Sequence, residues 1–157
     1  MEITLGSILI WGFVGTIVLT LIQSAGQGLR LTRMSIPFLL GTALTANLDR
    51  SAAYGFIIHF LNGWGFSAVY ALVFGAWGQA TWWQGLMLGL LHGLFALAVL
   101  IPLLPSIHPR MAGRNSSPKD VALVEPPGFM ALNYGARTPA VTILAHLAYG
   151  SILGAFL

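Results

Sequence analysis

The chain carries no charged residue over residues 52–77, which read AAYGFIIHFLNGWGFSAVYALVFGAW. A helix that crosses a bilayer needs about 20 predominantly apolar residues. This stretch is long enough and apolar enough, so it predicts a membrane-spanning helix. Three other stretches meet the same criterion, and the predicted spans cover about residues 6–28, 53–77, 83–104 and 139–157.

The composition supports the same fold class. Apolar residues make up 57% of the 157 residues and charged residues 7%, whereas a soluble domain carries about 25% charged residues. We therefore predict an all-α membrane protein whose four helices form one bundle domain over residues 1–157. The absence of cysteine excludes disulfides, iron–sulfur clusters and thiolate zinc sites. Seven Lys and Arg residues are too few to suggest a nucleic-acid partner.

The positive charges predict the orientation. All of them lie between the first and second spans or between the third and fourth: Arg30, Arg33, Arg50, Arg110, Arg114, Lys119 and Arg137. By the positive-inside rule these two loops face the cytoplasm, so both termini are expected on the periplasmic side. The start of the chain lacks the basic region of a signal peptide, so the first span is expected to remain in the mature protein.

The first loop holds a further short segment at residues 35–48. Ile36, Leu40, Leu44 and Leu48 fall on one helical face, which predicts an amphipathic helix lying at the membrane interface. A re-entrant segment is the alternative. In the third span, Pro102 and Pro105 are expected to break or end the helix near the interface.

The two halves of the chain show a weak internal similarity. His59 begins the run HFLNG and His146 begins the run HLAYG, and small residues follow each run at matching positions. Each half would comprise a span, a basic loop and a returning span. This pattern predicts a parallel repeat about an axis along the membrane normal, with chance similarity as the alternative.

Small residues recur at intervals of four in every span. These rows predict close helix packing, because helices in lipid associate where their backbones can approach. They mark either the inner face of the bundle or a contact between copies. The packing residues that we single out are Gly12, Gly63, Ser67, Gly85, Gly89, Gly93, Gly150 and Gly154.

Three histidines within the spans are the candidate functional residues: His59, His92 and His146. An ionisable residue in a membrane span suggests a functional site. Neutral imidazole binds metals readily, so these residues are the candidate ligands of a haem b, or of a zinc or copper ion. The structural alternative is that each histidine only bridges helices through hydrogen bonds, for example to Thr20 or a backbone carbonyl.

Other polar residues give weaker evidence. No Asp or Glu lies within a predicted span, which argues against a proton relay. Gln23 and Gln79 lie near span ends, where solvation is expected. His108 is expected to contact lipid headgroups or solvent. No serine has a base and an acid arranged around it in the sequence, so no catalytic residue is predicted.

Several motifs resemble a known group of proteins. They run from His92-Gly93-Leu94 to His108-Pro109-Arg110-Met111, then through Glu125-Pro126-Pro127-Gly128-Phe129, and end at His146-Leu147-Ala148-Tyr149-Gly150. Over most of its length the chain resembles an uncharacterised family of small bacterial four-helix membrane proteins, a domain of unknown function. The resemblance implies a location in the bacterial inner membrane. It implies no activity, cofactor or catalytic residue.

The rows of small packing residues and the scarcity of candidate catalytic residues together predict a non-enzymatic role. We expect a small accessory or scaffold subunit that packs against itself, as a homo-oligomer, or against a larger membrane complex in the lipid bilayer. One alternative is a haem- or metal-binding redox protein that uses the intramembrane histidines. Another is a small oligomeric transporter, which would need an aqueous cavity that reaches the membrane midplane near His146 and Asn62.

Overall fold

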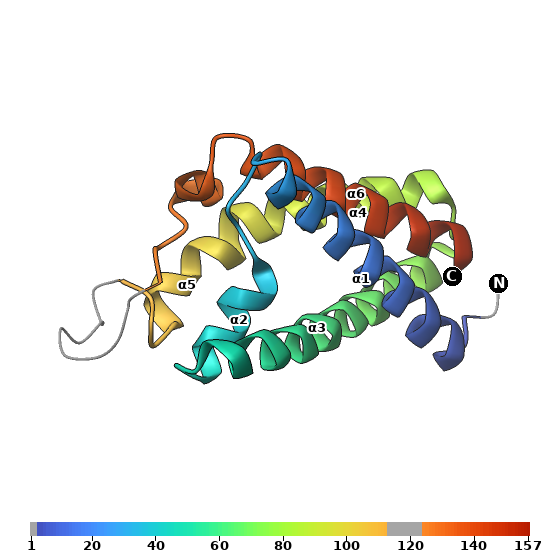
Figure 1. Cartoon of the computed structure of the whole chain (residues 1–157). Helices are drawn as coiled ribbons and strands as arrows, with labels where there is room; N and C mark the ends of the chain where they lie inside the picture. The colour runs from blue at the N-terminus through green and yellow to red at the C-terminus, as the bar shows by residue number, and fades with distance from the viewer. Residues whose placement is uncertain (1–2, 113–123) are drawn as a thin grey trace.

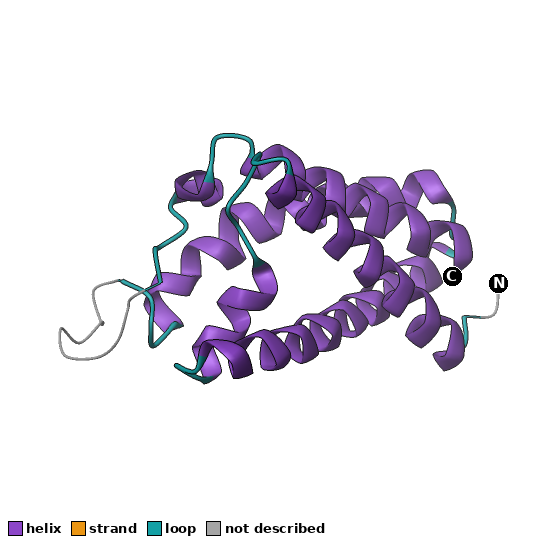
Figure 2. Cartoon of the chain, viewed as in Figure 1, coloured by secondary structure: helices purple, strands orange, loops and turns teal. Residues whose placement is uncertain are grey.

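The computed structural model describes residues 3–112 and 124–157, and within these ranges the regular secondary structure is helical (Figures 1 and 2). In this described part of the chain, four helices are long and apolar enough to cross a membrane. They are α1 (Leu5–Gly28), α3 (Leu48–Trp77), a continuous helix over Trp82–Ile107, and α6 (Thr138–Phe156). The prediction of a multi-pass, all-helical membrane protein is confirmed at this level.

Polar caps determine where the helices begin. Thr4 and Ser7 form a reciprocal capping box at the start of α1, and Thr81 caps the helix that begins at Trp82. Asn47 accepts a hydrogen bond from the Arg50 backbone N–H at 3.0 Å, so α3 begins at Leu48, earlier than predicted. Such caps satisfy backbone N–H groups that have no partner within the helix.

The third span corrects the expectation at Pro102. The helix does not end there but comprises α4 (Trp82–Phe95), the π-helix η1 (Ala96–Leu100) and α5 (Ile101–Ile107). Proline lacks an N–H group and its ring crowds the carbonyl one turn earlier. A wider π turn before Pro102 accommodates that crowding, because the Ile101 N–H bonds back to the Ala96 carbonyl.

The helices pack as two groups. α4 packs most extensively against α6, α3 packs against α1 and the short helix α2 (Ile36–Leu44), and α1 joins the groups through α6. Both termini lie at one end of the molecule, and α2, α5 and the 3-10 helix η2 (Phe129–Tyr134) lie toward the other (Figure 1). We call these the termini side and the loop side. That the loop side faces the cytoplasm remains a prediction.

Glycine brings α2 and α3 into close contact. A Cβ atom on Gly41 would overlap the Ser51 carbonyl, and one on Gly55 would overlap the Pro37 carbonyl. These pairings place α2 antiparallel to the first turns of α3. A short helix in the first loop thus exists as expected, whereas its position at the interface, the re-entrant alternative and the internal repeat remain predictions.

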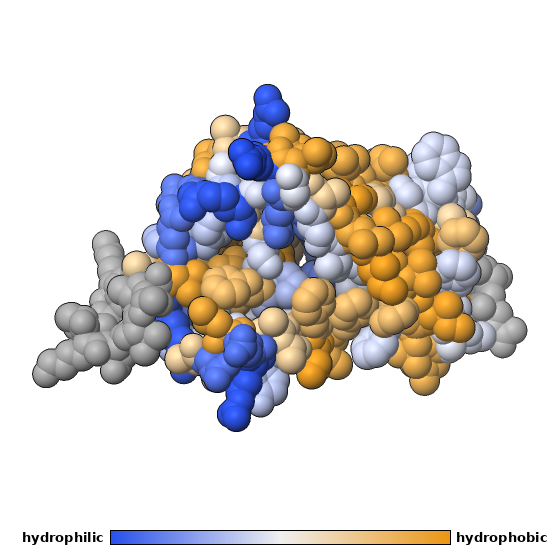
Figure 3. All heavy atoms as spheres, in the orientation of Figure 1, coloured by the Kyte–Doolittle hydropathy of each residue, from blue (hydrophilic) through white to orange (hydrophobic). Residues whose placement is uncertain are grey.

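The surface of the bundle suits a lipid environment. Many large apolar side chains are exposed, among them Leu72, Leu91 and Ile107. In the space-filling view, hydrophobic atoms cover much of the termini-side part and hydrophilic atoms gather toward the loop side (Figure 3). This distribution is what a bilayer-embedded chain with basic loops requires.

Candidate functional site

The three candidate histidines come together around one cavity. Its volume is about 280 Å³, and His59, His92 and His146 all line it from α3, α4 and α6. Asn62 also lines it. The sequence placed these residues on separate helices, and the fold brings them to one site.

His146 is buried on α6, and its protonation follows from its hydrogen bond. Its Nδ1 lies 2.8 Å from the Thr142 carbonyl oxygen, which can only accept. The neutral ring therefore carries its proton on Nδ1 and has a lone pair on Nε2. The Gly89 backbone lies so close that a Cβ there would overlap the His146 carbonyl.

His59 is buried on α3 and contacts α1. The Thr20 hydroxyl donates to the Thr16 carbonyl at 2.6 Å, so its oxygen accepts from His59 Nε2 at 3.0 Å. The neutral ring then carries its proton on Nε2 and has a lone pair on Nδ1. This bond between helices is the one that the structural alternative predicted, and it uses only one of the two ring nitrogens.

His92 lies among aromatic rings. Its ring centroid is 3.9 Å from that of Phe66, 4.6 Å from that of His146 and 6.0 Å from those of Tyr70 and Tyr149. The buried Nδ1 of His92 has no hydrogen-bond partner within residues 3–112 and 124–157. A buried polar atom left without a partner costs about 1–3 kcal/mol, so this arrangement calls for an explanation.

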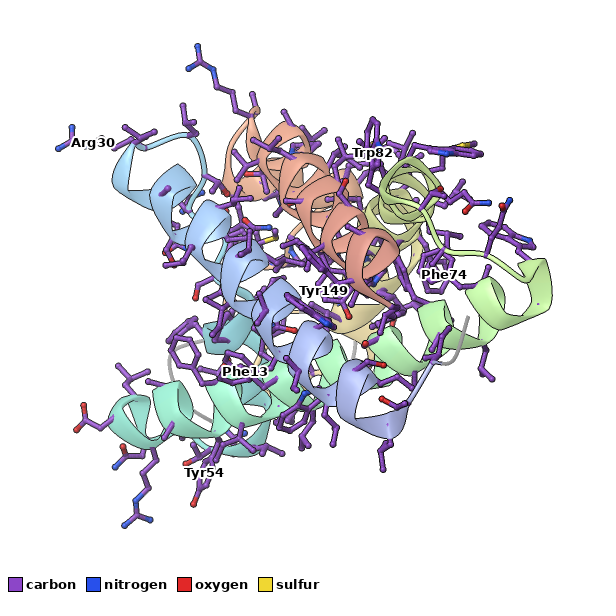
Figure 4. The ribbon with its side chains drawn as sticks, turned by 90° about the vertical axis from the view of Figure 1, so that its right-hand side faces the viewer. Phe13, Arg30, Tyr54, Phe74, Trp82 and Tyr149 are labelled. Carbon is purple, nitrogen blue, oxygen red and sulfur yellow. The ribbon has the colours of Figure 1, made fainter. Side chains whose placement is uncertain are left out.

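Tyr149 lies at the centre of the bundle (Figure 4) and lines the cavity. It points from α6 toward α3, and its hydroxyl donates to the Gly63 carbonyl at 2.6 Å. Its ring occupies the space beside Gly15, where a Cβ atom would lie 2.9 Å from the ring. Tyr149 thereby connects three helices.

Gln23 belongs to the site, which corrects the expectation that it is solvated near a span end. It is only 5% exposed, lines the cavity, and donates from Nε2 to the Thr142 hydroxyl at 3.2 Å. Its Oε1 has no partner among the described residues. The spacing of Thr16, Thr20 and Gln23, all on one face of α1, is the sequence feature that could have pointed to it.

A second, smaller cavity adjoins the first. Its volume is about 170 Å³, and it shares Leu19, Gln23, Ile36 and His59 with the histidine-lined cavity. Its other walls are largely polar side chains near the ends of α1 and α2: Thr20, Ser24, Gln27 and Ser35. A hollow surrounded by pale and blue atoms is visible in this part of the surface (Figure 3). Gln23 and His59 thus separate the main cavity from a polar recess on the loop side.

The π-helix contributes directly to the main cavity. Ala96 and Leu100, its first and last residues, both line it. Widened turns of this kind occur frequently at functional sites, because they displace side chains from their regular helical positions. Here the widened turn follows His92 by one helical turn.

The predicted packing residues lie at the close contacts between helices. A Cβ on Gly12 would lie 2.8 Å from the Ser67 Cβ, and one on Gly63 would overlap the Thr16 hydroxyl. In α4 and α6, added Cβ atoms would overlap carbonyl oxygens of the facing helix at Gly85 and Gly150, and equally at Gly89 and Gly154. A Cβ on Gly93 would lie 3.0 Å from Ile143.

The geometry does not favour ligation of a metal or haem. The described residues contain no group of three His, Cys, Asp or Glu side chains placed to hold a metal ion. The rings of His92 and His146 meet edge to face at 82° and 4.6 Å. A porphyrin cannot enter between rings already in contact, so this pair does not form the axial ligands of a haem.

The loop side corrects the expectation for His108. This residue is 5% exposed, and its Nε2 donates to the Leu39 carbonyl at 3.0 Å while its Nδ1 accepts from the Arg110 backbone N–H at 3.1 Å. The Arg110 guanidinium also donates to the Thr42 carbonyl, at 3.0 Å. His108 and Arg110 therefore connect α5 to α2 rather than contacting solvent.

Comparison with protein families, curated proteins and solved structures finds no match for this chain. The resemblance to a family of small bacterial membrane proteins therefore stays a prediction.

Proposed function

We propose that this protein is a non-enzymatic membrane protein that binds a small molecule in the histidine-lined cavity. The observation that carries the proposal is the convergence of His59, His92 and His146 on one cavity. Gln23 and Asn62 join them there. Polar groups are expensive within a membrane span and are tolerated where they line a cavity or bind a ligand.

The chemistry of the cavity supports binding rather than catalysis. Among the residues that the structure describes, its lining includes no Asp, Glu, Lys or Arg. Hydrogen bonds hold His146 and His59 in defined neutral forms. General acid–base catalysis needs a group that exchanges a proton with the reacting atoms. The hydroxyl beside His59 is that of Thr20, which donates its proton to the Thr16 carbonyl and accepts a hydrogen bond from the ring, so His59 does not act as its base.

The accessory role predicted from the packing rows gains less support. Most of the singled-out small residues face another helix of the same chain at close range. They are therefore not free to form a contact with a second copy or a larger complex. A small transporter, by contrast, needs a cavity near His146 and Asn62, and both residues line the cavity. Binding is the step that a carrier and a ligand-binding protein share.

The test is to identify what the cavity holds. The protein is purified in lipid nanodiscs, and its bound small molecules are extracted and compared by mass spectrometry. Ala96→Phe fills the cavity from η1, and Ala53→Phe on the exposed face of α3 is the matched control. We expect a molecule enriched in the wild type and in Ala53→Phe, and reduced at least about tenfold in Ala96→Phe. Identical extracts from all three would contradict the proposal.

The same preparation tests the redox alternative. A visible absorption spectrum and an elemental analysis of the wild type report a haem or a bound metal. We expect a colourless, metal-free protein. A haem spectrum that disappears in His92→Phe would instead establish the redox alternative.

A further inference from the structure

Several hydrogen-bond acceptors belong to side chains that line the main cavity, beside His92, whose Nδ1 has no partner among the described residues. His146 offers the lone pair of Nε2 and His59 that of Nδ1, because their other nitrogens donate to Thr142 and Thr20. The Oε1 of Gln23 is an acceptor without a partner in the described part of the chain, on a side chain that is 5% exposed. A ligand that donates hydrogen bonds would satisfy these atoms.

The charge of the ligand follows from the lining. A cationic donor such as an ammonium group would need a counter-ion, because an unpaired charge is costly within a membrane. Within residues 3–112 and 124–157, no acidic side chain lines the cavity, and no Lys or Arg lines it to pair with an anion. An uncharged donor is left, of which the hydroxyl group is the simplest.

The cavity also has apolar walls and reaches the surface. Leu40, Leu104 and Ile107, from α2 and α5, line it. Ile107 is 73% exposed, and Asn62 on α3 is also exposed. α3 makes no extensive contact with η1 or α5. The cavity therefore opens between α3 and α5, on a surface that a bilayer would cover.

We propose that the ligand is an uncharged amphiphile with a hydroxyl head, such as a long-chain or isoprenoid alcohol, which enters from the bilayer. Its head lies among Gln23, His59 and His146, and its chain lies along α2 and α5 toward the lipid. The proposal rests on the proposed function and adds the chemical class and the entry route. Asn62, a polar residue at the opening, is placed to contact the head as it enters.

The experiment uses full-length protein in nanodiscs and a dodecanol that carries a photoactivatable diazirine in its chain. Cross-linked peptides are mapped by mass spectrometry, and unlabelled 1-dodecanol, dodecyl methyl ether, dodecylamine and dodecane compete. We expect labelling on α2 and α5. We also expect 1-dodecanol to compete about tenfold better than the ether, because the ether keeps the oxygen but cannot donate. Equal competition by alcohol, ether and alkane would overturn the hydroxyl assignment.

Variants then locate the head. Gln23→Leu is expected to lower the preference of the alcohol over the ether to about threefold or less, since one acceptor is lost. Asn62→Leu lies on the exposed surface and preserves the core, so it keeps the test valid if Gln23→Leu does not fold. Leu61→Asn, a neighbouring exposed site outside the cavity lining, is the control and should leave the preference unchanged. A preference unchanged in both Gln23→Leu and Asn62→Leu would overturn the placement of the head.

The outcomes separate this inference from the proposed function. If Ala96→Phe abolishes a co-purified molecule but the alcohol probe labels no cavity residue, the cavity binds a ligand of another class. If amine outcompetes alcohol, the head is cationic and the assignment is wrong. If neither extraction nor labelling distinguishes Ala96→Phe from Ala53→Phe, the cavity binds nothing and both proposals fail.

Discussion

The termini side and the loop side of the bundle differ in how the helices meet. On the termini side, α4 and α6 pack backbone against backbone, so a Cβ on Gly85 or Gly150 would overlap the facing carbonyl oxygen. Toward the loop side, α3 and α5 are separated by the histidine-lined cavity of about 280 Å³. In lipid no hydrophobic force drives helices together, so close backbone packing is what holds α4 against α6. Similar packing joins α2 to α3 on the loop side, whereas α3 and α5 make no extensive contact with each other.

The largest effect on stability is expected where the backbones of α4 and α6 are in contact. Gly85→Ala adds one methyl group that would overlap the Gly150 carbonyl, so we expect it to destabilise the fold by about 3 kcal/mol or more. Gly75→Ala is the matched control, because nothing lies within 4 Å of its added Cβ; it should stabilise α3 by about 0.5–1 kcal/mol. Thermal unfolding in mild detergent compares the two. Similar melting temperatures for both variants would mean that α4 and α6 do not pack this closely.

The termini side is also the part that the sequence predicts best. Four apolar stretches predict four spans, and the intervals of four between Gly85, Gly89 and Gly93 indicate one face of a helix. Such patterns are local: they depend on composition and on the 3.6-residue helical period alone. The helix ends at Thr4 and Thr81 depend equally on nearby residues.

The loop side could not be predicted to the same extent, because burial there depends on distant parts of the chain. Gln23 is buried by its contact with Thr142 on α6, and His108 is buried by α2. The position of a residue relative to the end of its span does not predict either of these contacts. The path of the helix through Pro102 likewise depends on how η1 adapts, and a proline alone does not distinguish a break from a widened turn.

A moderate loss of stability is expected when a buried polar side chain that has hydrogen-bond partners is replaced by an apolar one. Thr32 and Thr138 are buried and share a hydrogen bond of 2.7 Å, and the Thr32 hydroxyl also accepts from the Met34 backbone N–H at 3.0 Å. Thr32→Val leaves these partners unpaired, so it should cost about 1–3 kcal/mol.

The companion variant is Gln23→Leu. It removes a carbonyl oxygen that has no partner among the described residues and loses only the bond to Thr142, so its stability should stay within about 1 kcal/mol of the wild type. Unfolding of both variants by denaturant in ligand-free detergent measures the difference. If Gln23→Leu loses as much stability as Thr32→Val, Gln23 is a structural residue and the cavity has no vacant acceptor there.

The smallest expected effect on stability concerns residues 125–134, which lie on the loop side. Glu125 forms an ion pair with Arg33 at 3.0 Å, and the Tyr134 hydroxyl donates to the Glu125 backbone carbonyl. Burial and, to a lesser extent, the Glu125 carboxylate raise the pKa of Tyr134 from 10.0 to about 12, and Arg33 opposes this shift.

Because the pKa of Tyr134 is raised in the folded state, its contribution to stability is complete below pH 10 and is lost as the pH rises through 12. Tyr134→Phe should be less stable than the wild type by about 1 kcal/mol at neutral pH, since the hydrogen bond is absent. This difference should narrow between pH 10 and pH 12, because only the wild type must lose its proton from a partly buried hydroxyl. Melting temperatures of both proteins over this interval test it, and the other tyrosines cancel in the comparison. If the difference in melting temperature stays constant with pH, Tyr134 is solvated and its hydroxyl does not pack against the Glu125 backbone as described.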